Sequence, residues 1–314
     1  MRAFIFPGQG SQAVGMGRAL ADAYPAARAV FDEVDEALGE HLSRVIWEGP
    51  AESLQLTANT QPALMAVSLA AFRVLEAEAG LDLKRDAAYV AGHSLGEYSA
   101  LAAAGSLGLA DTARLLRLRG ESMQRAVPVG EGAMAALLGL DLPVAAEVAA
   151  EAAGGEVCDA ANDNGPGQVV VSGVRAAVER AVEIAKGRGA QRAVMLPVSA
   201  PFHCALMRPA ADAMREALAG TAIRAPAVPV VANVEAAPLT DPDAIRDALV
   251  RQVTGTVRWR ESVARMAADG VTGFVEVGAG KVLTGLVKRI AAGSTATAIG
   301  TPDDVAAFRA TLQG

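Results

Sequence analysis

Short apolar runs alternate along this chain with longer segments in which apolar residues recur every three or four positions. The apolar runs at Arg2–Phe6, Ala88–Gly92 and Gly273–Val277 predict buried strands, with further extended segments at Val228–Asn233 and Thr297–Ile299. The periodic segments predict helices at Ala26–Leu38, Thr60–Ala79, Leu109–Ala126, Met207–Leu218, Asp243–Val253, Arg258–Ala268 and Val305–Leu312, and another that ends near Ile290. Strands that alternate with helices in this way predict an α/β fold.

The pattern changes to shorter elements after Gly132. Strands are predicted at Ala133–Leu138, Glu156–Ala161, Gln168–Ser172 and Gln191–Leu196, and helices at Leu142–Ala152 and Val174–Arg188. The resulting order, β-α-β-β-α-β, is that of a ferredoxin-like unit, with Asn162–Gly167 as its central turn region. We therefore expect residues 128–197 to form a compact insert, and residues 1–127 and 198–314 to form the core.

The composition narrows the class of protein. Of the 314 residues, 52% are hydrophobic, and the net charge of −7 argues against nucleic acid as the main partner. No apolar stretch reaches membrane-spanning length, and the N-terminus has no cleavable signal pattern, so no membrane association is expected. The two cysteines, Cys158 and Cys204, do not make a disulfide framework, which favours a cytoplasmic location.

The segment Gly92-His-Ser-Leu-Gly96 lies between a predicted strand and an alanine-rich helical stretch. This strand–turn–helix context is that of the G-x-S-x-G nucleophile elbow, in which glycines leave room for a tight, strained turn. Such a turn would lift the Ser94 hydroxyl above the end of the strand. The free N–H groups at the start of the following helix could then stabilise a developing oxyanion.

Two glycine-rich loops resemble nucleotide sites, but neither has the full pattern. Residues 8–13 satisfy G-x-G-x-x-A, yet a helical segment follows where a dinucleotide site needs a second strand that ends in an acidic residue. Around Lys281, the Walker pattern lacks its first glycine and the Ser or Thr after the lysine. We therefore predict no cofactor and no metal, and interpret the first loop as the source of a second oxyanion donor.

A serine nucleophile needs a base, and histidine is the usual one. Of the three histidines, His41 lies in a polar helical region where an exposed or capping position is expected. His93 is adjacent to Ser94, and side chains diverge across an elbow, so a structural role is expected. His203 lies in a Pro-containing loop after the insert and is the candidate base.

The remaining reactive side chains fit this site less well. Cys204 adjoins His203 without elbow geometry, and free cysteines are mostly small buried hydrophobic residues. Hydrolases of the α/β class take an acid from between the serine and the histidine, but here Asp159 and Asp163 fall within the insert. We therefore predict a Ser–His dyad in which a backbone carbonyl orients the histidine.

Arginines on the helix predicted at Leu109–Ala126 could supply a carboxylate-binding group. We expect at least two of Arg114, Arg117 and Arg119 to lie in solvent. One arginine directed into a cleft beside Ser94 would instead bind a carboxylate with both arms of its guanidinium.

Seven separated segments together carry a more specific pattern. They are Phe6–Gln12, Gly92–Glu97, Arg117–Gly120, Gly132–Met134, Asn164–Gln168, Pro201–His203 and Glu276–Lys281. In this order they resemble the malonyl-CoA:acyl-carrier-protein transacylase family of bacterial fatty-acid synthesis, over nearly the whole chain. The resemblance implies a hydrolase-like α/β core with a mostly parallel sheet and an inserted ferredoxin-like subdomain.

The resemblance also implies a ping-pong transfer of the malonyl group from malonyl-CoA to the phosphopantetheine thiol of holo acyl carrier protein. Ser94 would form a malonyl ester with His203 as base. The backbone N–H groups of Gln9 and Leu95 would form the oxyanion hole.

Further site residues follow from the same resemblance. Arg119 would bind the malonyl carboxylate, and the main-chain carbonyl of Gln252 would orient the histidine. Phe202 stands where some bacterial members have a small polar residue, and it should favour malonyl over methylmalonyl by narrowing the site. Ala279 replaces a proline that is common in the family, which affects loop rigidity rather than a catalytic group.

Three other functions use the same sequence features. A thioesterase or esterase would use the same Ser–His pair with water as acceptor, and an acyltransferase of polyketide synthesis would serve another pathway. A non-catalytic carrier-protein docking module would form no adduct. Because carrier proteins of this family are typically acidic, we also expect a basic docking patch, with the candidates Lys186, Arg188, Arg192, Lys288 and Arg289.

Overall fold

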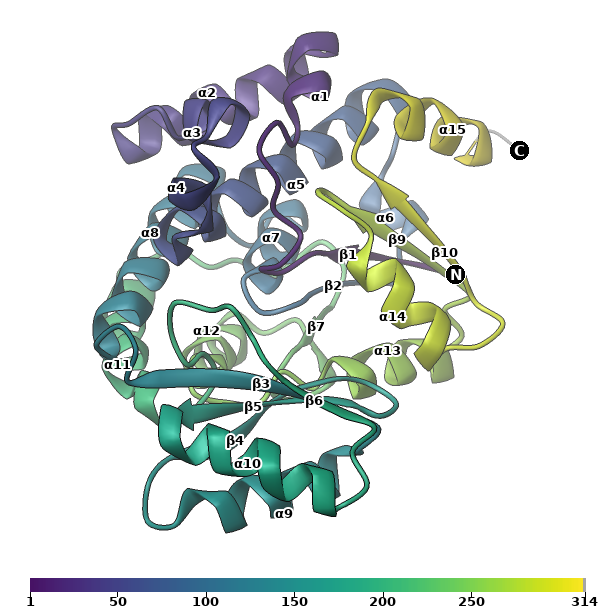
Figure 1. Ribbon diagram of the computed structural model, residues 1–314. Coiled ribbons are helices and arrows are strands. Elements are labelled where there is room, and N and C mark those ends of the chain that lie inside the picture. Colours follow the sequence, from purple (N-terminus) through teal and green to yellow (C-terminus); the bar gives the residue numbers. More distant parts are fainter. Residues whose placement is uncertain (313–314) are drawn as a thin grey trace.

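Two β-sheets organise the chain in the computed structural model, which describes residues 1–312 (Figure 1). The larger sheet has the order β10-β9-β1-β2-β7-β8 and contains β1 (Arg2–Phe6), β2 (Tyr89–Gly92), β7 (Val230–Ala232), β8 (Ala237–Leu239), β9 (Gly273–Val277) and β10 (Thr295–Ile299). All neighbouring strands in it are parallel except β7 and β8. The predicted α/β class with a mostly parallel sheet is confirmed.

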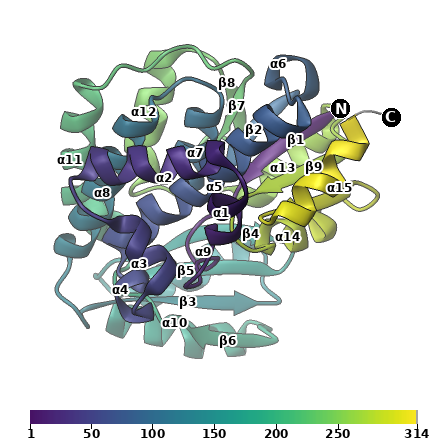
Figure 2. The ribbon, with the colours of Figure 1, turned by 90° about the horizontal axis from the view of Figure 1, so that it is seen from above.

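Strand β1 shows why helices cover both faces of this sheet. Successive side chains point to opposite faces, so Phe4 and Phe6 join one apolar cluster while Ala3 and Ile5 join another. The phenylalanine cluster includes residues of α2 (Pro25–Leu38), α5 (Thr57–Ala79), α7 (Gly96–Ala103) and α8 (Leu109–Ala126), and the other cluster includes residues of α13 (Trp259–Ala268) and α14 (Val282–Ile290). The sheet is therefore the middle of three layers (Figures 1 and 2).

The smaller sheet is antiparallel, with the order β4-β5-β3-β6. Its strands are β3 (Gly132–Leu138), β4 (Cys158–Gly165), β5 (Gln168–Val174) and β6 (Arg192–Met195). The same part of the chain contains the helices α9 (Leu142–Ala153) and α10 (Arg175–Gly187), and sheet and helices together form one unit. The predicted element order, β-α-β-β-α-β, is confirmed. This unit has its own apolar cluster, and Figure 1 shows it below the larger sheet.

Seven further helices complete the described part of the chain. They are α1 (Arg18–Ala23), α3 (Leu42–Glu48), α4 (Ala51–Gln55), α6 (Leu83–Asp86), α11 (Arg208–Ala219), α12 (Pro242–Gln252) and α15 (Pro302–Leu312), with a short 3-10 turn at Ala205–Met207. Most of the predicted helix and strand boundaries lie within three residues of the observed ones. Among residues 1–312, no helix combines the length and the apolarity that crossing a membrane requires.

The prediction that Thr60 begins a helix is wrong by one turn, because α5 begins at Thr57. Pro62 consequently lies inside the helix and cannot donate to the carbonyl of Ala58. That carbonyl accepts from Arg117 Nη1 at 2.7 Å instead. The predicted solvent position of at least two of the three α8 arginines is therefore wrong too, since the Arg117 side chain is only 16% exposed.

The prediction of a turn region at Asn162–Gly167 is correct only at its end, because the turn between β4 and β5 is at Pro166–Gly167. Strand β4 runs to Gly165, and its pairing with β5 shifts register twice, between Ala160 and Asn162 and between Asp163 and Gly165. Such bulges re-aim side chains without ending a strand. The polar residues that suggested a turn are thus held in a strand.

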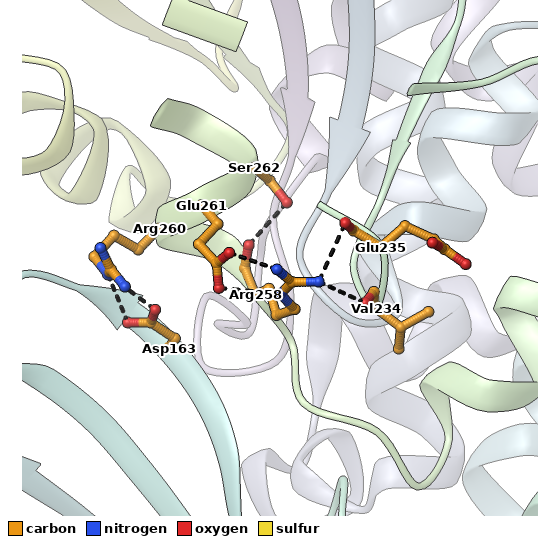
Figure 3. Close-up of polar contacts among 7 residues, drawn as sticks. All are labelled: Asp163, Val234, Glu235, Arg258, Arg260, Glu261 and Ser262. Carbon is orange, nitrogen blue, oxygen red and sulfur yellow. Dashed lines mark hydrogen bonds and ion pairs between the residues drawn. The ribbon is translucent and has the colours of Figure 1, made fainter. Parts of the chain in front are cut away.

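The bulged end of β4 is also where the smaller sheet is joined to the rest of the chain. The N–H of Asp163 donates to the Val257 carbonyl at 2.9 Å, and the N–H of Val257 donates to the Ala161 carbonyl at 2.9 Å. Arg260 Nε reaches both carboxylate oxygens of Asp163, at 2.9 and 3.1 Å (Figure 3). We call these contacts the β4 joint.

Candidate active site

Ser94 follows β2 on a strained turn. Its φ is 54°, a conformation that costs a non-glycine residue free energy. The chain passes so close to itself that a Cβ on Gly92 would lie 1.9 Å from the backbone of Gly96, and a Cβ on Gly96 would lie 2.3 Å from the Phe6 carbonyl. Any side chain at either position would clash with the backbone, so both must be glycine. This explains the two glycines of the G-x-S-x-G pattern.

Asn233, directly after β7, holds this turn from the neighbouring strand. Its Oδ1 accepts from the Ser94 N–H at 2.7 Å, and its Nδ2 donates to the Gly92 carbonyl at 2.7 Å. No local sequence pattern marks this residue, because the pairing of β2 with β7 depends on tertiary structure. The strained turn thus has a buried partner that fixes it.

The structure brings Ser94 and His203 together although 109 positions separate them. Ser94 Oγ lies 2.7 Å from His203 Nε2, and His203 Nδ1 lies 2.8 Å from the carbonyl oxygen of Gln252. A carbonyl can only accept, so Nδ1 carries the proton and Nε2 is free to accept from the serine. No carboxylate contacts this ring in the described part of the chain, as the dyad prediction requires.

The electrostatic surroundings keep this imidazole neutral. Burial, followed by the positive charge of Arg119, lowers the pKa of His203 to about 3. A neutral ring near pH 7 is able to accept a proton from the serine hydroxyl.

Two backbone donors face the same region. The N–H groups of Gln9, in the loop after β1, and of Leu95, at the start of α7, have no hydrogen-bond acceptor within residues 1–312. The Gln9 side chain is held by Thr57 Oγ1 at 3.0 Å. Free backbone N–H groups beside a serine can stabilise negative charge on an oxygen.

Arg119 is buried beside Ser94, with 1% of its surface exposed. Its Nη1 donates to Gln61 Oε1 at 2.7 Å, and its Nη2 lies 2.8 Å from Gln252 Oε1 and 3.2 Å from Ser94 Oγ. Its Nε has no partner among the described residues. The neutral amides of Gln61 and Gln252 thus orient a buried cation that retains a free donor.

A glycine allows α8 to bring Arg119 inward. A Cβ on Gly120 would lie 2.6 Å from both the Thr57 carbonyl oxygen and the Ala58 Cα of α5. Of the neighbouring arginines, Arg114 is 58% exposed and Arg117 binds α5, so only Arg119 reaches Ser94.

A cavity of about 110 Å³ opens above these groups. Its lining consists of Gln9, Gln61, His93, Ser94, Leu95, Arg119, Asn162, Val198, Phe202 and His203. The cavity is roomy enough for a small acyl group, since about 10–15 Å³ of such volume already holds one water. Three wall residues were not predicted from the sequence, namely Gln61, Val198 and Asn162; Asn162, from the bulged end of β4, was assigned to a turn.

The other candidates occupy the positions that the sequence indicated. His41 is exposed, and His93 Nε2 is bound to Asn164 Oδ1 at 2.7 Å rather than to the serine. Cys204 is fully buried, and burial raises its pKa to about 11. Asp159 accepts from the Ala205 N–H at 2.8 Å. In residues 1–312 we find no group of three or more His, Cys, Asp or Glu side chains that could hold a metal ion.

Comparison with known proteins defines the class of protein, an acyltransferase. Residues 3–312 match the model of the acyl transferase domain family. The chain is 52% identical over 305 residues to the malonyl CoA-acyl carrier protein transacylase of Escherichia coli K12, and the match covers 97% of both chains. The chain therefore belongs to the malonyl CoA-acyl carrier protein transacylase family.

Solved structures are similar over the same extent. A crystal structure of the acyl-carrier-protein-S-malonyltransferase from Bartonella henselae superposes with a TM-score of 0.97 at 56% identity, and the match covers 100% of this chain and 99% of that one. A malonyl-transacylase in complex with its type II PKS acyl-carrier protein gives a TM-score of 0.95 at 44% identity over 99% of both chains.

Proposed function

We propose that this chain transfers the malonyl group of malonyl-CoA to the phosphopantetheine thiol of holo acyl carrier protein and so supplies fatty-acid elongation. The observation that carries the proposal is the position of Arg119, a buried cation whose Nη2 lies 3.2 Å from the Ser94 hydroxyl. A serine that only hydrolysed neutral esters would have no use for such a group. Membership of the transacylase family supports the same substrate and acceptor.

In the first half-reaction, Ser94 Oγ attacks the thioester carbonyl and His203 Nε2 takes the hydroxyl proton. The oxyanion forms near the N–H groups of Gln9 and Leu95. When the intermediate collapses, the carbon–sulfur bond breaks and the coenzyme A sulfur leaves with the proton from His203. A malonyl ester then remains on Ser94.

In the second half-reaction, the carrier thiol takes the place of coenzyme A. His203 accepts the thiol proton, the sulfur attacks the serine ester, and the proton returns to Ser94 Oγ as the ester bond breaks. In both half-reactions, His203 therefore takes a proton from the attacking group and gives it to the leaving group. The Gln252 carbonyl, 2.8 Å from Nδ1, supports this role because it keeps the ring in a single tautomer.

Arg119 gives this scheme its acyl preference. A guanidinium pairs with the free carboxylate of a malonyl group, whereas an acetyl group would leave the cation unpaired in a buried site. The 3.2 Å distance from Nη2 to Ser94 Oγ supports this role, since it places the guanidinium beside the serine that would carry the acyl group.

The finer description of the fold belongs to the same proposal. The parallel sheet, with a nucleophile turn after β2, supports a hydrolase-like core formed by residues 1–127 and 198–314. The strand order β4-β5-β3-β6 and a separate apolar cluster support a ferredoxin-like insert at residues 128–197. The free, buried Cys158 and Cys204 suit the reducing environment of a cytoplasmic enzyme.

Ion pairs reduce the number of candidate residues for the proposed basic docking patch. Lys186 is paired with Glu183, and Arg188 is paired with Glu147 and Glu151. Since these pairs neutralise part of the charge, Lys288, Arg289 and Arg192 are the better candidates of the five. Charge reversal at Lys288 should raise the KM for carrier protein, and reversal at Lys186 should raise it less.

Intact-mass spectrometry tests the central step. Incubation with malonyl-CoA should give a malonyl adduct that is absent in Ser94→Ala and forms at least about 10³-fold more slowly in His203→Ala. The adduct should discharge to holo carrier protein. Absence of the adduct from the parent protein would support a docking module, and rapid release of free malonate without carrier would support a thioesterase.

A polyketide acyltransferase is the second candidate, and the similarity to the malonyl-transacylase of a type II PKS carrier complex favours it. The chemistry at Ser94 would be the same in both pathways. Comparing discharge rates to fatty-acid and polyketide carrier proteins would separate them.

A further inference from the structure

One buried carboxyl group contacts the site but takes no part in the steps above. Glu97 lies in the first turn of α7, three residues after Ser94, and only 1% of its surface is exposed. Its Oε2 accepts from the backbone N–H of Asn233 at 2.9 Å and from Gln252 Nε2 at 2.8 Å. A buried carboxyl group costs free energy that its contacts must offset.

Each of these two partners holds a different part of the site. Asn233 fixes the Ser94 turn through its side-chain contacts to the N–H of Ser94 and the carbonyl of Gly92. Gln252 holds His203 through its backbone carbonyl and Arg119 through its side-chain oxygen. Gln252 Nε2 also lies 3.0 Å from the Ser94 carbonyl oxygen.

We propose that Glu97 is a positioning residue that sets malonyl selectivity by holding the Gln252 side chain with its oxygen toward Arg119. The inference rests on the proposed function and extends it to a residue that does not contact substrate. The primary amide of Gln252 bridges a hydrogen-bond acceptor, the Glu97 carboxyl oxygen, and a hydrogen-bond donor, the Arg119 guanidinium. Reversing this amide would place its NH₂ group against the guanidinium.

The physical consequence of losing Glu97 follows from this geometry. Without the acceptor at Oε2, Gln252 Nε2 keeps only the longer contacts to the Ser94 carbonyl, at 3.0 Å, and to Asn233 Oδ1, at 3.4 Å. The side chain then gains rotational freedom, and Arg119 loses one of its two fixed amide acceptors. A displaced guanidinium binds a carboxylate less well, so malonyl transfer should suffer more than acetyl transfer.

A merely structural role for Glu97 predicts a different outcome. A carboxylate in the first turn of a helix stabilises that helix, and its loss would lower the stability of the protein without altering acyl preference. Glu276 provides a matched control. It is equally buried and accepts from the N–H groups of Leu283 and Thr284 at the start of α14, outside the Gln252 network.

The experiment compares Glu97→Gln, Glu97→Leu and Glu276→Gln with the parent protein. Adduct formation on Ser94 is measured with malonyl-CoA and acetyl-CoA, and the ratio of the two kcat/KM values is the readout. Glu97→Leu should lower this ratio about tenfold or more. Glu97→Gln, which keeps an acceptor oxygen but not the charge, should lower it less, by about threefold, and Glu276→Gln should leave it unchanged.

If Glu97→Leu does not fold, a coupling measurement replaces it. Gln252→Met removes the side-chain bridge and keeps the backbone carbonyl. Glu97→Gln should then lower the ratio severalfold in the parent background and have no further effect in Gln252→Met.

Two outcomes overturn the inference. One is a folded Glu97→Leu protein with the parent ratio, and the other is a Glu97→Gln effect that persists unchanged in Gln252→Met. Failure of the parent protein to form any malonyl adduct would instead reject the proposed function.

Discussion

The mostly parallel sheet with its helices, which we propose as the core, and the antiparallel unit, which we propose as the insert, contribute to the site in different ways. The core supplies the reacting groups, because the loop after β1, the turn after β2 and Asn233 after β7 all lie at the carboxyl ends of parallel strands. The insert has a separate apolar cluster and supplies Asn162 to the cavity wall. The core thus provides the reacting groups and most of the cavity wall, and the insert adds one side of that wall through Asn162.

The difference follows from strand direction. Parallel strands end at the same edge, so backbone groups and side chains from several strands converge there. Antiparallel strands end alternately at opposite edges, and fewer of their end residues can meet at one point. The insert contacts the site through the bulged end of β4, where the Asp163–Arg260 pair fixes it to the core. Substitutions in the core should therefore change chemistry, and substitutions at the joint should change stability and cavity shape.

The largest effect among the substitutions outside the Ser–His pair is expected at Arg119. In Arg119→Ala, the malonyl carboxylate would enter a buried site without its cation, at a cost of about 3–5 kcal/mol. The kcat/KM for malonyl-CoA should fall by about 10²–10⁴-fold, while acetyl-CoA use changes less. Adduct formation with the two substrates measures both values.

Arg114→Ala is the control for this substitution, since it removes an exposed arginine from the same helix. It should leave both rates close to those of the parent. Equal losses for malonyl and acetyl in Arg119→Ala would reject the role of the guanidinium as a carboxylate clamp.

The core also contains a pH-dependent contribution to stability. Burial raises the pKa of Glu97 from 4.5 to about 7, against the opposing contacts to Asn233 and Gln252. A raised pKa means that the folded state holds the proton more tightly. The stability linked to this group is therefore fully present below about pH 4.5 and is lost as the pH rises through 7.

Urea unfolding of the parent and Glu97→Gln at several pH values measures this contribution. Relative to the variant, the parent should lose about 3 kcal/mol of unfolding free energy between pH 4.5 and pH 8. A constant difference between the two proteins across this range would show that Glu97 does not titrate there.

The sequence predicted the parts of the site that depend on local pattern. The elbow around Ser94 is set by glycines whose neighbours lie within a few residues, and buried strands and amphipathic helices follow from periodicity. Elimination among three histidines indicated His203. The implied roles of Arg119 and Gln252 required the family resemblance, because other arginine and glutamine side chains of α8 and α12 would have looked equivalent by periodicity alone.

The parts that the sequence analysis missed depend on tertiary contacts. Nothing near Asn233 or Gln61 indicates that they bind Ser94 and Arg119, since those partners lie 139 and 58 positions away. The prediction of a turn where β4 continues to Gly165 failed for a similar reason. Asn and Asp favour turns locally, but pairing with Val257 and the Asp163–Arg260 contact hold them in a strand.

The β4 joint should respond asymmetrically to substitution. Asp163 is fully buried, whereas the Arg260 side chain is 35% exposed. Arg260→Ala would leave a buried carboxyl group without its partner, and should lower the unfolding free energy by about 2 kcal/mol. Asp163→Asn leaves a cation that water can reach and should cost less.

Arg265→Ala, which breaks the exposed pair with Asp269 on the same helix, should be nearly neutral. Urea unfolding of Arg260→Ala, Asp163→Asn and Arg265→Ala measures the three losses of unfolding free energy, which should decrease in that order. A larger loss in Asp163→Asn than in Arg260→Ala would contradict the view that burial of the carboxyl group makes the joint asymmetric.

The smallest effect is expected at Phe202, where the chain returns from the insert to the core. This side chain lines the cavity beside Ser94, and the cavity of about 110 Å³ leaves little room for a branched acyl group. One methyl group in an apolar pocket is worth about 1–3 kcal/mol of discrimination. Phe202→Ala should therefore raise the rate with methylmalonyl-CoA relative to malonyl-CoA by about tenfold, as measured by competition for the Ser94 adduct. Val198→Ala enlarges the same cavity from another side and serves as the comparison, because an equal gain there would mean that total volume, rather than the position of Phe202, sets the preference.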